Sequence, residues 1–262
     1  MSSNQRRFYK TLLSLSLLPL MTVTIISLGI NHTSALNISA KTPQLISQNF
    51  TGFIASFWER RPRRRNISRS GAGFCAIAPG LVDTYKIWHN KPVFLWNYSG
   101  KPEQVQLVVR DYDTQTILWK QDVNISAQKL AYTAPQPLEA GKLYQWQLVG
   151  KTSSNWFTFQ VLPSQERQKI ATELQALEQK LKGDRASAEV IAQKKAEYFL
   201  NYQIQHQTET GTFNAWSDAL QVISEVENPS PAFVQKREEF VASVCTPSQP
   251  TARKGNQRDF RF

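Results

Sequence analysis

The spacing of apolar residues changes once along this chain, from every second residue to every third or fourth. Between residues 75 and 162, short apolar stretches alternate with polar residues and are separated by turn signals, a pattern typical of half-buried strands. From residue 163 to 245 the spacing becomes helical, as in Ile170, Leu174 and Leu177. We therefore expect an α+β chain in which the strands precede the helices.

The strand-forming part carries its alternation most clearly at two places. Val105, Leu107 and Val109 alternate with polar residues, and so do Tyr144 and Trp146. Several such strands at intervals of about ten residues favour two packed sheets. The stretch LEAGKLYQW at 138–146 resembles the sixth strand of fibronectin type III-like domains, where a leucine, a turn glycine and a tyrosine corner precede the strand. We predict a fibronectin/immunoglobulin-like β-sandwich.

The helical part divides into four amphipathic segments. We expect Ser164 to cap the first helix and Gly183 to end it, and Asp184 to cap the second. The third is expected to include Phe213, and the fourth to follow the turn NPSP at 228–231. Short connections between these segments predict a four-helix αα-hairpin bundle after the sandwich.

The head of the chain has the pattern of an export signal. Arg6, Arg7 and Lys10 precede a mostly apolar stretch at 11–30, and small residues follow up to Ala35. The apolar stretch is also just long enough to remain as an uncleaved membrane anchor. In either case we expect an exported protein of the periplasm or cell envelope, either soluble after cleavage or anchored by residues 11–30.

The positive charge of the chain lies outside its central part. The formal net charge is +11, yet residues 75–245 hold 17 Lys and Arg against 18 Asp and Glu, a net of −1. A nucleic-acid-binding domain carries its basic residues on the folded surface. We therefore expect no nucleic-acid partner. The expected organisation is a signal peptide or membrane anchor at 1–35, a polar and Arg-rich linker at 36–74, a β-sandwich at 75–162, a helical bundle at 163–245 and a basic disordered tail at 246–262.

The linker contains a dense group of arginines. Like charges repel and Gly and Pro break regular structure, so an extended conformation is expected. One hypothesis is a contact with anionic lipid or an acidic wall polymer, since clustered Arg gains free energy near an anionic surface. The other is a solvated spacer. The arginines concerned are Arg60, Arg61, Arg63, Arg64, Arg65 and Arg69.

Few residues point to chemistry. Cys75 and Cys245 can form a disulfide in an oxidising compartment, or remain two buried thiols. The three histidines lack metal-ligand spacing, and no nucleophile elbow or phosphate loop occurs. We expect no metal, no cofactor and no enzymatic activity. Trp88 and Trp156 are predicted to be ligand-facing, and such rings could stack on sugars.

Four stretches together carry a resemblance to a known family. They are GFCAIAPG at 73–80, IWHNKPVFLW at 87–96, LEAGKLYQW at 138–146 and WSDAL at 216–220. In this order the chain resembles an uncharacterised family of exported cyanobacterial proteins. The resemblance implies a sandwich followed by helices, and no activity. We expect a non-enzymatic protein-interaction module that binds an envelope protein. The alternatives are a carbohydrate-binding module of the cell envelope and a hydrolase with an unrecognised site.

Overall fold

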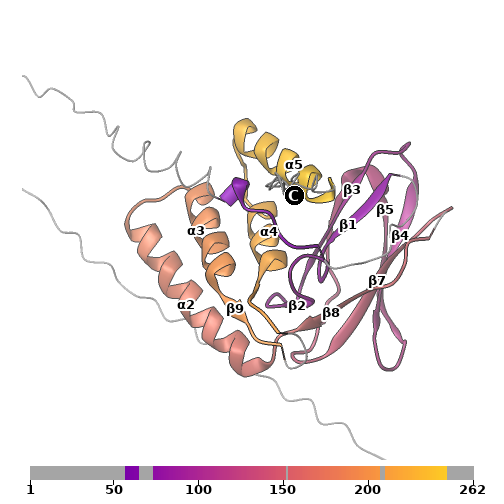
Figure 1. Ribbon diagram of the computed structural model, residues 1–262, viewed down its shortest axis with the longest axis horizontal. Helices are drawn as coiled ribbons and strands as arrows, with labels where there is room; N and C mark the ends of the chain where they lie inside the picture. The colour runs from indigo at the N-terminus through magenta and orange to yellow at the C-terminus, as the bar shows by residue number, and fades with distance from the viewer. Residues whose placement is uncertain (1–56, 65–72, 152, 207–209, 247–262) are drawn as a thin grey trace, which may run out of the picture. The chain divides into compact units, whose positions relative to one another are not determined.

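The computed structural model describes residues 57–64, 73–151, 153–206 and 210–246 (Figure 1). The predicted export signal, most of the polar linker, Arg65, Arg69 and the tail after Thr246 lie outside these residues. All of the described residues belong to one unit, Gln44–Phe262. They form an α+β structure with sheets first and helices last, which confirms the predicted class.

Five strands form the larger sheet. Its order is β2-β8-β7-β4-β5, antiparallel except for the parallel pair of β2 and β8. In β7, Tyr144, Trp146 and Leu148 are buried and the residues between them are not, so the predicted period of two is confirmed. The bounds are β2 (Lys86–Ile87), β4 (Gln104–Asp111), β5 (Ile117–Asn124), β7 (Leu143–Val149) and β8 (Phe157–Val161).

The smaller sheet is covered on both faces. It has the order β1-β3-β6, with β1 (Phe74–Ala78), β3 (Val93–Tyr98) and β6 (Lys129–Ala131). Phe94 and Trp96 of β3 pack in a core shared with the larger sheet. Val93 and Leu95, on the opposite face, pack in a second core with the helices. Successive side chains of a strand point to opposite faces, so β3 is apolar without interruption over its first four residues.

The helices follow the sheets in the chain. They are α2 (Ser164–Gly183), α3 (Ala188–Asn201), α4 (Trp216–Ser224) and α5 (Pro231–Cys245). Figure 1 shows α2, α3 and α4 side by side and α5 next to β1 and β3, in agreement with their contacts. A two-stranded hairpin of β9 (Gln203–Ile204) and β10 (Phe213–Asn214) connects α3 to α4. Within the described residues, no helix combines the length and the apolar character needed to cross a membrane.

Three helix-end predictions need correction. Ser164 is the first residue of α2 and Pro163 occupies its N-cap position, with no side-chain cap. Asp184 ends α2 rather than starting α3, because its N–H bonds back to the carbonyl of Lys180. The cap of α3 is Ser187, whose side chain accepts a hydrogen bond from the backbone of Val190. Phe213 lies in β10, because it pairs with Ile204 across the hairpin.

Residues 57–64 form what we call the strap, and they are folded onto the helices. Their sequence predicted an extended linker, but residues 57–59 form a helical turn and Phe57 is only 2% exposed. Its ring centroid lies 5.4 Å from that of Phe240 and 6.1 Å from that of Trp216. Burial of this aromatic ring accounts for the difference, since an aromatic side chain loses much apolar surface to water when it packs.

Truncation of Phe57 tests whether the strap belongs to the core. We expect Phe57→Ala to lower the free energy of unfolding by about 3 kcal/mol, as buried Phe-to-Ala changes do. Glu59→Ala is the matched control, since Glu59 lies on the same turn but is exposed; its effect should stay within about 0.5 kcal/mol. Chemical denaturation measures both values, and equal small effects would mean that the strap is only a linker.

Candidate functional site

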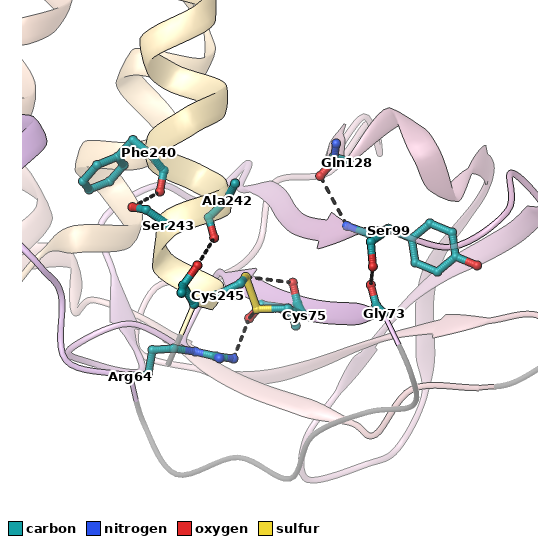
Figure 2. The surroundings of a disulfide bond; sticks show 12 residues. Arg64, Gly73, Cys75, Ser99, Gln128, Phe240, Ala242, Ser243 and Cys245 are labelled. Carbon is teal, nitrogen blue, oxygen red and sulfur yellow. Dashed lines mark hydrogen bonds between the residues drawn. A yellow bond between two sulfur atoms is a disulfide. The ribbon is translucent and has the colours of Figure 1, made fainter. Parts of the chain in front are cut away.

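A disulfide joins the first strand to the last helix. Cys75 in β1 and Cys245 at the end of α5 are bonded, with a Cα–Cα distance of 6.0 Å, which confirms the predicted pair. Figure 2 shows the bond between the end of α5 and the β1 strand. In the sheet, Cys75 pairs with Asn97 of β3. The bond therefore holds the C-terminal end of α5 beside the smaller sheet.

The arginines of the strap are anchored within the protein. Each of the four described guanidinium groups donates to a different segment, and Figure 2 shows Arg64 beside the disulfide. The acceptors are Asn201 Oδ1 for Arg60 (3.4 Å), the Ser243 carbonyl for Arg61 (3.0 Å), Asp83 Oδ1 for Arg63 (3.2 Å) and the Ala76 carbonyl for Arg64 (3.5 Å). Arg61 thus lies at the C-terminal end of α5, where a positive charge is favourable. A contact with an anionic surface stays a prediction for these residues.

The two tryptophans that were predicted to face a ligand both have partners in the protein. Trp88 is half-buried against the helix core, and its indole N–H donates to the Arg167 carbonyl at 3.0 Å. The Arg167 guanidinium in turn donates to the Trp88 carbonyl at 2.8 Å. Trp156 has the Arg110 guanidinium 3.7 Å from its ring centroid. The structure does not bring the two rings together into one site.

Helix α4 is buried along its whole length and carries four polar side chains. The Asp218 carboxylate is 0% exposed and accepts hydrogen bonds from the backbone N–H groups of Trp88 and His89 at 3.0 Å. It is also 2.6 Å from Nδ1 of His89. Gln221 accepts from the Val93 N–H and donates to the Lys91 carbonyl, both at 3.0 Å. These bonds dock α4 onto the segment between β2 and β3.

No role was predicted for these α4 residues from the sequence. A buried carboxylate bound to His Nδ1 also occurs in catalytic triads, where it orients the imidazole. Among the described residues, no Ser, Thr or Cys side chain is hydrogen-bonded to His89. The bonds of Asp218 to the two backbone N–H groups anchor α4 to the 88–89 segment. The signal available in the sequence was the presence of Ser217, Asp218 and Gln221 in a segment that is otherwise apolar.

A cavity of about 460 Å³ lies next to the disulfide, between β3 and α5, and we call it the β3–α5 pocket. Asn97, the sheet partner of Cys75, lines it from β3, and Ala242 lines it from the last turn of α5. Figure 2 labels two of its lining residues, Ala242 on α5 and Gln128. The lining residues are Leu95, Asn97, Ser126, Ala127, Gln128, Lys129, Ser224, Arg237, Glu238, Glu239, Val241 and Ala242.

Two cations, Lys129 and Arg237, line this pocket. Burial lowers the pKa of the Lys129 ammonium below its ordinary value, and the positive charge of Arg237 acts in the same direction. The carboxylates of Glu225 and Glu238 oppose this shift. Lys129 Nζ also donates to the Ser224 carbonyl at 3.4 Å, at the end of α4.

A second, more open concavity of about 640 Å³ runs along α2 and α3, and we call it the α2–α3 groove. The Tyr198 hydroxyl donates to Glu173 Oε2 at 2.5 Å, and the Tyr202 hydroxyl to Glu166 Oε1 at 3.3 Å. The two tyrosine rings pack with centroids 5.8 Å apart. The groove is lined by Lys169, Glu173, Leu177, Lys194, Glu197, Tyr198, Asn201, Tyr202 and Gln203.

Both tyrosines of the groove resist ionisation. Burial, followed by the charge of Glu166 and the hydrogen bond to it, raises the pKa of Tyr202 to about 12. Burial, followed by the hydrogen bond to Glu173, raises the pKa of Tyr198 well above its usual range. The hydroxyls therefore remain hydrogen-bond donors in the folded protein at any pH near neutral.

A high-pH titration tests the state of Tyr202. At about pH 11, above the ordinary tyrosine pKa of about 10, Tyr202→Phe should leave the tyrosinate absorbance of the folded protein nearly unchanged. In urea at the same pH, the variant should lose one eighth of the signal, since the chain has 8 tyrosines. A folded pKa that is raised stabilises the protein below the unfolded pKa, and this gain disappears as the pH rises through about 12. Loss of one eighth in the folded protein as well would contradict the assignment.

The described residues contain no group of three or more His, Cys, Asp and Glu that could hold a metal ion. The structure thus presents three features for comparison with known proteins: the disulfide with its strap, the β3–α5 pocket and the α2–α3 groove. Comparison of the chain with protein-family models and with curated proteins finds no match in either set.

Proposed function

We propose that the protein is a non-enzymatic interaction module of the cell envelope, which binds another envelope protein through the α2–α3 groove. The observation that carries this proposal is the pair of adjacent tyrosines, Tyr198 and Tyr202, held in an open groove by hydrogen bonds to α2. Tyrosine is enriched in protein interfaces and at their energetic hot spots.

The groove is suited to a protein surface because its polar groups are already in place. The hydroxyls of both tyrosines are fixed on carboxylates, so little side-chain freedom remains to be lost on binding. Lys194 and Glu197 form an ion pair at 2.9 Å on the same side of α3. Lys169 lies with its ammonium 5.9 Å from the ring centroid of Tyr202. Charges of both signs around aromatic rings give specificity towards a complementary surface.

An oxidising compartment is part of the proposal. Disulfides persist in secreted and periplasmic proteins and are rare in the cytosol, so the Cys75–Cys245 bond is compatible with export. Cleavage or retention of the apolar head stays a prediction, and so does the resemblance to the exported cyanobacterial family. The carbohydrate-binding alternative depended on Trp88 and Trp156, and their internal partners give it no further support.

We also propose a more specific fold for the two halves. The two sheets share one core, and the Tyr144 hydroxyl accepts a hydrogen bond from the Glu139 N–H at 2.8 Å. This bond has the geometry of the tyrosine corner of fibronectin- and immunoglobulin-like sandwiches. For the helices, the contact between the successive helices α2 and α3 supports the first αα-hairpin of the predicted four-helix bundle.

Capture of a partner from envelope extracts tests the function. Tyr198→Ala/Tyr202→Ala should reduce capture of the partner about tenfold or more, as the loss of a hot spot does. Tyr112→Ala is the matched control, since Tyr112 is 41% exposed in the turn between β4 and β5. A photo-crosslinker at Lys169 should reach the same partner, and one at Lys120 on β5 should not. Equal capture by the double variant and the control would refute the proposal.

A further inference from the structure

The β3–α5 pocket has no part in the proposed function, and its dimensions fit a small molecule. Its volume of about 460 Å³ falls within the range of ligand sites. Leu95 lines one side of the pocket from β3, and Val241 and Ala242 line the other side from α5. Such pockets are mostly apolar and contain a few polar groups that fix the orientation of the ligand.

Four charged side chains line the pocket, and they differ in their partners: Lys129, Arg237, Glu238 and Glu239. Glu239 accepts a hydrogen bond from Gln235 at 2.8 Å, and the charge of Glu238 acts on Lys129. Arg237, in contrast, has no ion pair or hydrogen bond with any other residue in the described part of the chain. Lys129 lines the same pocket and carries the same charge, and the charge of Arg237 acts against it. Two like charges that share a partly desolvated site repel each other, and an anion placed between them relieves the repulsion.

We propose that the β3–α5 pocket binds a small molecule with an apolar body and a carboxylate. The carboxylate lies between Lys129 and Arg237, and the body packs on Leu95 and the α5 residues Val241 and Ala242. A guanidinium can bind a carboxylate through two parallel hydrogen bonds, which gives both affinity and orientation. The polar side chains of Asn97 and Gln128 also line the pocket and can accommodate a polar substituent on the ligand.

The disulfide gives this pocket a fixed wall. Cys245 follows Ala242 by less than one helical turn, and the bond ties this end of α5 to the strand that pairs with Asn97. A wall that is already in position loses little conformational entropy when the ligand binds. The pocket is therefore expected to exist before the ligand arrives.

Calorimetric titration of the full chain with three short amphiphiles tests the proposal. Octanoate, octanol and octylamine have the same apolar body and differ in the charge of the head group. Octanoate should bind at least about tenfold more tightly than either of the others, the ratio expected for one charged hydrogen-bonded pair. Equal binding of octanol, tighter binding of octylamine through Glu238, or no binding of octanoate would each overturn the proposal.

Two variants locate the binding. Arg237→Gln should weaken octanoate binding about tenfold and leave octanol binding unchanged. Lys236→Gln is the matched control, since Lys236 is the preceding cation on α5 and does not line the pocket. Thermal unfolding verifies that both variants are folded, and Lys129→Gln replaces Arg237→Gln if the latter is not. Equal effects of Arg237→Gln and Lys236→Gln would place the binding elsewhere and overturn the assignment, whereas the α2–α3 groove and its partner would be unaffected.

Discussion

The double substitution Cys75→Ala/Cys245→Ala is expected to lower the free energy of unfolding by about 5 kcal/mol. The two cysteines are 170 residues apart in the chain, so the bond closes a long loop in the unfolded state. In the chain-entropy model the stabilisation grows with the logarithm of loop length and reaches about 5 kcal/mol for a loop of this size. For a domain of 150–250 residues, each kcal/mol shifts the melting temperature by about 2–4 °C.

The native state should survive this loss. Helix α5 keeps the buried side chains of Phe233, Phe240 and Val244, and Arg61 still donates to the Ser243 carbonyl near its end. The effect should therefore appear mainly in the unfolded ensemble, as a lower denaturation midpoint with retained far-UV circular dichroism. Either single substitution should match the double variant, because either one opens the loop.

Reduction provides the control for the disulfide prediction. A dithiol reductant should shift the melting temperature of the wild type to that of the double variant and leave the double variant unchanged. A double variant that melts within about 2 °C of the wild type, which is less than 1 kcal/mol at this size, would mean that the loop is already closed by other contacts in the unfolded chain.

The strands and helices were largely predictable because local periodicity follows local burial. The alternation in β7 and the helical spacing of Ile170 and Leu174 both correspond to buried residues. The continuous apolar stretch of β3 also has a local explanation, since helices cover one face and the larger sheet covers the other. The pairing of Cys75 with Cys245 was predictable because no other cysteine competes.

The strap was not predictable from local pattern. Its arginines find acceptors on segments far away in the sequence, among them Asn201 and Ser243. In the sequence these arginines show only a run of like charge, which by itself favours an extended, solvated segment. The acceptors on α3 and α5 come close to these arginines only in the folded chain.

Helix α4 illustrates the same limit. Its polar residues bond to backbone groups between residues 80 and 93, more than 120 positions away, such as the N–H of Gly80 on Ser217 Oγ. Sequence spacing alone places Asp218 on a helix. It does not show that the segment of Trp88 and His89, after β2, brings two N–H groups and an imidazole to the carboxylate. This docking links the α2–α3 pair to the sheets, because α4 contacts both α3 and β1.

Removal of the Asp218 carboxylate is the second change with a large expected effect. We expect Asp218→Ala to lower the free energy of unfolding by about 4 kcal/mol, since loss of one partner from a buried charged cluster costs roughly 3–5 kcal/mol. The substitution leaves the N–H groups of Trp88 and His89 without an acceptor. Water cannot replace the lost carboxylate easily, because Asp218 is 0% exposed. It also leaves a cavity at the junction of α4 with the sheet side.

Two further variants separate the hydrogen bonds from the volume of the side chain. Asp218→Asn keeps the volume and one acceptor oxygen, so it should cost less than Asp218→Ala, while its amide N–H groups oppose the donors of Trp88 and His89. His89→Ala removes only the 2.6 Å bond and leaves both backbone bonds to Asp218, so its cost should be smaller, about 1–2 kcal/mol. Urea denaturation of the three variants measures the order, and hydrogen exchange at the Trp88 and His89 amides reports the loss of the anchor directly. If Asp218→Ala and His89→Ala lower the free energy of unfolding equally, the bond to the imidazole accounts for the whole effect. In that case α4 is not anchored through the backbone of the 88–89 segment.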